Sequence, residues 1–117
     1  ILLNNYSYYL ALANQNLTRA ESLIIKAIQI TPNSATFLDT YGWVLFQKKE
    51  YKKAEEVIFK AVMLSEESSG EILEHYGDVL NKLGKIKESL LFWNKAKENG
   101  EHSEKLLNKI HDKKYSE

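Results

Sequence analysis

The side chains that carry most protein chemistry are few in this sequence and do not form a catalytic pattern. No two of its histidines, His75, His102 and His111, are three or four residues apart, and there is no cysteine. Zinc sites built on helices need ligands at such spacing. No nucleophile stands beside a base, and no glycine-rich phosphate loop is present. We therefore expect no catalytic residue, no metal site and no cofactor.

The composition is that of a neutral globular segment. Its 117 residues hold 16 acidic and 16 basic side chains, so no net charge attracts nucleic acid or an anionic membrane. No apolar run approaches the roughly 18 residues that span a bilayer, so we expect no membrane insertion. Because the chain begins at Ile1 rather than Met, we expect a segment of a longer protein, preceded by further sequence.

The sequence repeats itself at a period of 34 or 35 residues. The stretch LDTYGWVL at 38–45 returns as LEHYGDVL at 73–80 and, more loosely, as LLNNYSYYL at 2–10. A second stretch follows each copy and carries two small residues seven positions apart. The recurring residues are Leu3, Tyr6, Ser7, Ala20, Ala27 and Pro32, then Leu38, Tyr41, Gly42, Ala54 and Ala61, then Leu73, Tyr76, Gly77, Ser89, Trp93 and Ala96. Repeats of this length are helical or mixed units that stack on one another.

Within each half-unit the apolar residues follow the i, i+3, i+4, i+7 spacing of a helix rather than the alternation of a strand. Ser34, after Pro32, is placed to cap a new helix, and Thr18 with Glu21 could form a capping box. The pattern predicts an all-α fold of three antiparallel helix pairs and a last helix. The expected ranges are 2–13 with 17–30, 35–48 with 51–65, 71–83 with 86–99, and 103–114.

The small residues have a packing role. Where two helices cross, a missing or one-carbon side chain lets their axes approach closely. We expect Gly42 to face Ala54, and Gly77 to face Ser89. A single pair cannot bury its apolar face, so the pairs must stack.

The two ends of such a stack expose apolar surface. We expect the last helix to cover one end with Leu106, Leu107 and Ile110. The other end would expose Ile1, Leu2, Leu3 and Tyr6, which we expect to be covered by upstream repeats of the same protein or by a second copy in a dimer.

With these residues in register, the sequence resembles the tetratricopeptide repeat family, whose unit is a helix–turn–helix of about 34 residues. The resemblance implies an α-solenoid of three units, at about 1–33, 34–68 and 69–102, and a capping helix and tail at 103–117. There are departures: Ser7 to Ala20 spans 13 residues rather than 12, and Glu66 replaces a proline. The sequence of the repeats also resembles the C-terminal end of larger bacterial proteins of this family from the cell envelope, which would imply an envelope or periplasmic location.

The family resemblance implies a scaffold that holds a peptide or protein segment in a concave groove, lined by the first helix of each pair. The groove positions it implies are Asn4, Tyr8, Asp39, Trp43, Glu74, His75 and Asp78. Trp43 is the candidate anchor, because buried aromatic residues are common binding hot spots. The alternative is that Trp43 only packs on a neighbouring helix. His75 has a similar alternative, a hydrogen bond to the neighbouring pair.

Acidic residues set the expected partner chemistry. Asp39 and Glu74 stand where a clamp for a partner's carboxylate would need lysine, so we expect no carboxylate clamp. An acidic groove favours a basic or neutral-polar segment. For Glu71 and Glu74 the alternative is that they offset the dipole at a helix start.

Two functions follow from the resemblance. The first is a non-enzymatic scaffold that binds a protein or peptide of unknown identity. The alternative is a purely structural end of a longer solenoid whose binding surface lies upstream.

Overall fold

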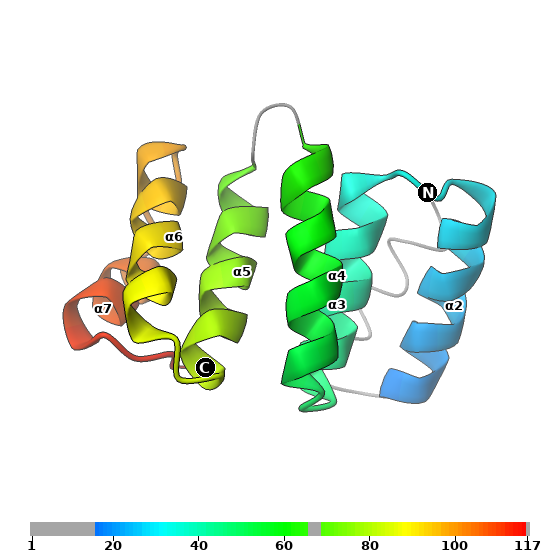
Figure 1. The fold of residues 1–117 in the computed structure, drawn as a ribbon, viewed down its shortest axis with the longest axis horizontal. Helices are drawn as coiled ribbons and strands as arrows, with labels where there is room; N and C mark the ends of the chain where they lie inside the picture. Colours follow the sequence, from blue (N-terminus) through cyan, green and yellow to red (C-terminus); the bar gives the residue numbers. More distant parts are fainter. Residues whose placement is uncertain (1–15, 66–68, 117) are drawn as a thin grey trace. The chain divides into compact units, whose positions relative to one another are not determined.

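The computed structural model describes residues 16–65 and 69–116, and every regular element in these ranges is an α-helix (Figure 1). The chain divides into two compact units, Ile1–Leu64 and Ser65–Glu117, which are described here one at a time. The first unit contains α2 (Leu17–Ile30), α3 (Ala35–Gln47) and α4 (Tyr51–Leu64). The second contains α5 (Gly70–Lys82), α6 (Ile86–Glu98) and α7 (Glu104–Asp112). In the described ranges no helix is both long and apolar enough to cross a membrane.

Six of the predicted helices are confirmed, with ends that differ by at most two residues. The last helix falls furthest short of its predicted range, because Lys113 adopts a left-handed conformation (φ 56°) directly after Asp112. The predicted helix at 2–13 lies outside the described residues. So do Ile1, Leu2, Leu3, Asn4, Tyr6, Ser7 and Tyr8, with the dimer predicted through that end.

The helix starts in the first unit show which polar residues cap them. Ser34 caps α3 as predicted, because its Oγ accepts a 3.2 Å hydrogen bond from the backbone N–H of Phe37. The predicted capping box of Thr18 and Glu21 is wrong. Asn16 caps α2 instead, and Thr18 already lies inside the helix. Glu21 instead forms an ion pair with Lys48 at the end of α3, with 2.8 Å between Oε1 and Nζ.

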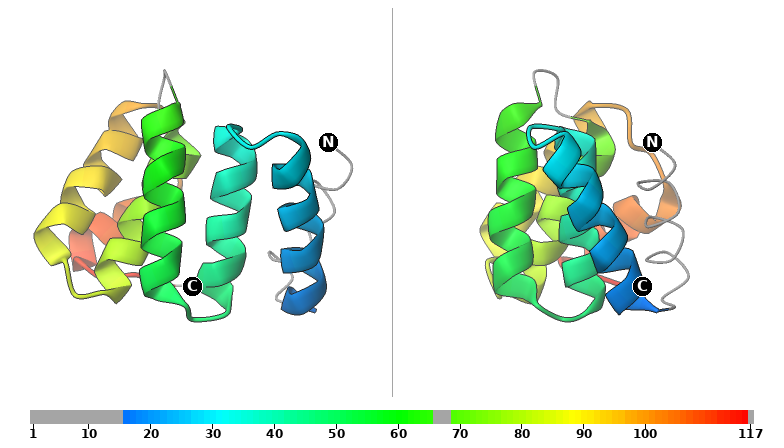
Figure 2. Two further views of the ribbon diagram at one scale, coloured as in Figure 1. Left: turned by 45° about the vertical axis from the view of Figure 1, so that its right-hand side comes forward. Right: turned by 90° about the vertical axis from the view of Figure 1, so that its right-hand side faces the viewer.

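In the first unit α3 packs against both α2 and α4, and Figure 2 shows the three helices in a row with α3 in the middle. The space that a side chain at Gly42 would need is filled by Ile58. Ile58 lies one helical turn beyond Ala54, the predicted neighbour. The glycine thus lets α3 and α4 approach each other, but a bulky residue rather than a small one fills the contact. The buried residues supplied by α2 and α4 are Ala20, Ile24 and Ala27, and Ala54, Ile58 and Ala61.

The second unit repeats this arrangement with α5 and α6. Trp93 fills the space beside Gly77, and Ser89 Oγ donates a 2.9 Å hydrogen bond to the Gly77 carbonyl. The predicted contact between Gly77 and Ser89 is therefore confirmed.

The last helix, α7, packs against α6. Leu106 is completely buried there, as predicted for a helix that covers the apolar end of the unit. The prediction for Leu107 is wrong, because this side chain is 40% exposed. Its position directly after Leu106 turns it about 100° away on a helix with 3.6 residues per turn.

Candidate functional site

In the first unit the predicted anchor, Trp43, belongs to a cluster of aromatic rings. It is only 8% exposed, and its ring stacks on Phe46, one turn along α3, with centroids 4.6 Å apart and planes 11° apart. The ring of Phe46 in turn packs in a T-shaped arrangement with that of Tyr51, the first residue of α4, with ring centroids 5.3 Å apart. The indole therefore packs within its own unit, against aromatic residues near the α3–α4 turn. Asp39, one turn before Trp43, is also buried.

A separate hollow of about 410 Å³ opens between α2 and α4 in the first unit. Its lining is mainly apolar, with Ile25 and Ile28 from α2, Tyr41 from α3 and Val57 from α4, and Lys60 is among its polar residues. Of the predicted groove residues that the structure describes, none lines this hollow.

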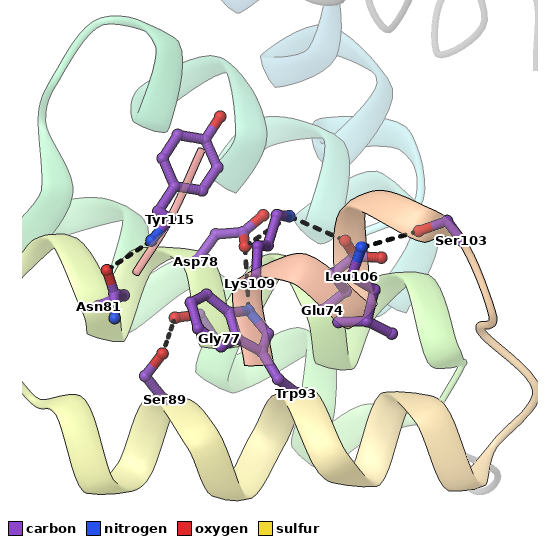
Figure 3. Close-up of polar contacts among 10 residues, drawn as sticks. All are labelled: Glu74, Gly77, Asp78, Asn81, Ser89, Trp93, Ser103, Leu106, Lys109 and Tyr115. Atoms are coloured by element: carbon purple, nitrogen blue, oxygen red, sulfur yellow. Dashed lines mark hydrogen bonds and ion pairs between the residues drawn. The ribbon is translucent and has the colours of Figure 1, made fainter. Parts of the chain in front are cut away.

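In the second unit the predicted groove acids are engaged by the last helix (Figure 3). Lys109 of α7 places its Nζ 2.8 Å from Glu74 Oε2 and 2.9 Å from Asp78 Oδ1, both on α5. The side chain of Lys109 is 6% exposed and that of Asp78 is 1% exposed. The ammonium group of Lys109 therefore forms ion pairs with two carboxylates and has little contact with solvent. We call Glu74 and Asp78 the acid pair.

Asp78 carries an unusual proton affinity because of this burial. Loss of water raises the pKa of Asp78 to about 6, although the positive charge of Lys109 and its hydrogen bond act in the opposite direction. For Lys109, burial lowers the pKa, but the attraction of Asp78 and the hydrogen bonds to the acid pair outweigh it, so its pKa is raised. Trp93 adds a further donor, since its Nε1–H donates to Asp78 Oδ1 at 3.0 Å.

The chain after α7 lies against the same helix, α5. The side-chain amide of Asn81 uses both of its ends: Nδ2 donates to the Lys113 carbonyl at 3.2 Å, and Oδ1 accepts from the Tyr115 N–H at 2.8 Å. The Tyr115 ring lies 5.2 Å from the Nζ of Lys82 and 5.2 Å from that of Lys109. Asn81 is one turn beyond Asp78, so the acid pair and Asn81 form a single row along α5. We call Glu74, Asp78 and Asn81 the α5 row.

The structure thus accounts for the predicted groove residues in three ways. Asn4 and Tyr8 lie outside the described residues. Asp39, Trp43 and His75 are buried. Glu74 and Asp78 are brought together by a lysine that was not predicted.

Lys109 is the residue that sequence reasoning missed. The run KIHDKK at 109–114 has the composition of a solvated basic patch, and that interpretation is wrong for Lys109, which is buried. A signal was present in the spacing, because Lys109 follows Leu106 by three residues and shares its helix face. A lysine on the apolar face of a terminal helix points to an acidic partner.

Comparison with known proteins supports the repeat architecture. No family model matches the chain, and no curated protein matches it. Among solved structures it is similar to YrrB, described as a TPR protein with an unusual peptide-binding site, at 30% sequence identity and a TM-score of 0.73. The match covers 86% of this chain and 50% of YrrB, so the chain spans about half the length of that protein. Three repeats in register, helices packed as pairs and this similarity show that the chain is a tetratricopeptide-repeat α-solenoid.

Proposed function

We propose that the chain is a non-enzymatic scaffold that binds a peptide or protein segment along the first-helix faces of its repeats, which form the concave groove of this family. One observation carries the proposal. The α5 row already binds a polypeptide segment, namely residues 109–115 of the chain itself, through a lysine and through main-chain atoms. The description of YrrB as a protein with a peptide-binding site supports the same role.

The partner that this proposal favours is basic or neutral-polar rather than a free carboxylate. Acidic side chains at the proposed groove positions repel a carboxylate and attract lysine or arginine. In the second unit a lysine is what the acid pair holds. The proposed groove residues are Asn4, Tyr8, Asp39, Trp43, Glu74, His75 and Asp78.

Selection from a random peptide display library tests this function. The wild-type chain should enrich peptides rich in lysine or arginine. Glu71, exposed near the start of α5 and one turn before Glu74 and His75, is the position to vary. Glu71→Lys should weaken the binding of the selected peptides several-fold, because it reverses a charge beside the proposed groove residues. Glu98→Lys is the matched control, since Glu98 is exposed at the end of α6, on the second helix of the pair.

Two results would contradict the scaffold. One is a library that enriches nothing above an unrelated helical protein. The other is a set of peptides that Glu71→Lys and Glu98→Lys weaken equally, which would mean that binding depends on overall charge and not on the α5 face.

A second candidate function is purely structural, as the end of a solenoid. The burial of Leu106 favours it, because this apolar side chain attaches α7 to the second unit as a cover would require. This function predicts that no library peptide binds the chain. It also predicts that substitutions in the α5 row change stability alone.

A further inference from the structure

The attachment of α7 to the second unit relies on few side chains. Of its residues, Leu106 and Lys109 are the two that are buried. Leu107 is exposed, as are Lys105 and His111. The connection from α6 passes through Gly100, whose φ of 103° ends the preceding helix. The buried side chains that hold the helix are thus one apolar and one charged, and Ile110 is partly buried beside them.

The contacts that α7 and the residues after it make with α5 are mostly polar, as in a bound peptide, whereas a helix that only covers a core makes mostly apolar contacts. Here the ammonium group of Lys109 and the carboxylates of Glu74 and Asp78 lose their hydration to form ion pairs. Such an exchange brings little net stability, but it discriminates strongly between correct and incorrect partners. In addition, Asn81 binds main-chain atoms at Lys113 and Tyr115, a contact that does not depend on their side chains.

We propose that the α5 row is a binding site for a lysine-bearing segment, and that residues 104–116 of the chain are its resident occupant. A partner segment enters by replacing this C-terminal segment. The partner segment must place a lysine against Glu74 and Asp78. A few residues after this lysine, its main chain must be non-helical and bind the side chain of Asn81. The inference rests on the proposed scaffold function and adds the chemistry of the partner and an autoinhibitory contact.

Replacement is physically reasonable because the α5–α6 pair keeps its own core. Trp93 fills the space beside Gly77 and bonds to Asp78, and Ser89 bonds to Gly77, so these contacts between α5 and α6 involve no atom of α7. Release of α7 uncovers mainly the site of Leu106 and the acid pair. The apparent affinity for a partner is then reduced by the fraction of molecules in which the site is occupied.

The experiment uses the full chain and a fluorescent peptide with the sequence of residues 103–116. Lys109→Gln in the chain removes the charge that holds α7 and leaves the α5 row intact. Leu106→Ala removes the apolar contact instead, and it serves if Lys109→Gln lowers the helical content measured by circular dichroism. Lys105→Gln is the matched control, because it removes an exposed lysine from the same helix.

The expected result is that either docking variant binds the peptide at least about tenfold more tightly than the wild-type chain, because the site is open more often. The Lys105→Gln chain should bind like the wild type. A peptide carrying Lys109→Gln should lose this binding to every chain. The indole N–H signal of Trp93 in NMR spectra should shift with the peptide, since that group bonds to Asp78.

Equal affinity of the docking variants and the wild-type chain would overturn the inference, as would equal binding of the Lys109→Gln peptide. Failure of the scaffold function looks different, because then no library peptide binds. A library peptide that binds the wild-type chain without moving the Trp93 indole signal or releasing α7 would keep the scaffold and refute the occupied α5 site.

Discussion

Trp93 and Lys109 donate to the same atom: Asp78 Oδ1 accepts from the indole Nε1–H at 3.0 Å and from the lysine Nζ at 2.9 Å. This oxygen therefore joins three helices of the second unit, since Asp78 lies on α5, Trp93 on α6 and Lys109 on α7. A carboxylate with so little exposure needs such donors, because an ionised group without them would be costly to bury.

Trp93→Phe should show how much the indole donor contributes. Phenylalanine keeps an aromatic ring beside Gly77 but cannot donate to Asp78. We expect the free energy of unfolding to fall by about 2–3 kcal/mol, the range for a hydrogen bond to a charged group plus a small loss of packing. Urea unfolding followed by circular dichroism gives this value. In an Asp78→Ala background, which has no acceptor at this position, the same substitution should cost clearly less, and an equal cost in both backgrounds would show that the bond is energetically unimportant.

The buried acid predicts a particular pH dependence. The pKa of Asp78 rises from 3.8 in its ordinary state to about 6 in the fold, chiefly through burial and against the pull of Lys109 and His75. The native state therefore holds a proton that the unfolded chain releases between these pH values. This contribution to stability is complete below pH 3.8 and is lost as the pH rises through about 6, at a slope of up to about 1.4 kcal/mol per pH unit.

Asp78→Asn isolates that slope from the other carboxylates. The difference in unfolding free energy between wild type and variant, measured in urea from pH 3.5 to pH 7.5, should change in favour of the variant as the pH rises. A difference that stays constant over this range would contradict the raised pKa.

The close helix contacts predict that alanine is harmful at two helical glycines. Glycine to alanine in a helix normally stabilises by up to about 1 kcal/mol. At Gly42 the new Cβ would collide with Ile58, and at Gly77 with Trp93. We expect each substitution to lower the unfolding free energy by about 1–3 kcal/mol instead. Thermal and urea unfolding measure this loss.

A paired substitution controls for the origin of that loss. Ile58→Ala removes the atoms closest to the new Cβ, so Gly42→Ala should cost less when Ile58→Ala is already present. Strict additivity of the two losses would show that the collision is not the cause.

Two lysines that both form ion pairs should respond very differently to removal. Lys109→Met removes the cation of the acid pair. It should cost more than about 1 kcal/mol and at most about 3–5 kcal/mol, the full cost applying while α7 stays docked over the unpaired carboxylates. Lys48→Met is the matched control. It breaks a 2.8 Å pair with Glu21 in which the side chains are 29% and 19% exposed, and should cost less than about 1 kcal/mol. If urea unfolding showed the same loss of unfolding free energy for both variants, the Lys109 ion pairs would not differ from the Lys48 pair in their exposure to water.

The sequence was sufficient to predict the helices and their pairing for reasons visible at single residues. Ala20, Ile24 and Ala27 recur at helical spacing and are all buried on α2. Ser34 follows Pro32 at a position where a hydroxyl caps a new helix. Both are local signals, and the spacing of small and bulky residues seen on α2 occurs three times in the chain, so each copy supports the others.

The docking of α7 could not be predicted in the same way. Whether Lys109 is solvated or buried depends on carboxylates 31 and 35 residues away in the chain, and no local pattern encodes that distance. Trp43 poses a related difficulty. Its place in the repeat assigns it to the groove, but the stacking of its ring depends on Phe46 and on Tyr51, which belongs to the next helix.

That aromatic stack determines how Trp43 should be tested. Trp43→Ala would remove a ring that is 8% exposed and stacked on Phe46, and should lower stability by about 3–5 kcal/mol. Loss of binding in this variant would then be ambiguous. Trp43→Phe keeps a ring against Phe46 and should cost less than about 2 kcal/mol, with unchanged helical content. If the indole contacts the partner, this variant binds selected library peptides several-fold more weakly, measured by fluorescence anisotropy. Phe59→Leu, at an exposed site on α4, is the control for aromatic loss as such. Unchanged affinity in Trp43→Phe would assign the indole to the core of the first unit and remove it from the proposed groove.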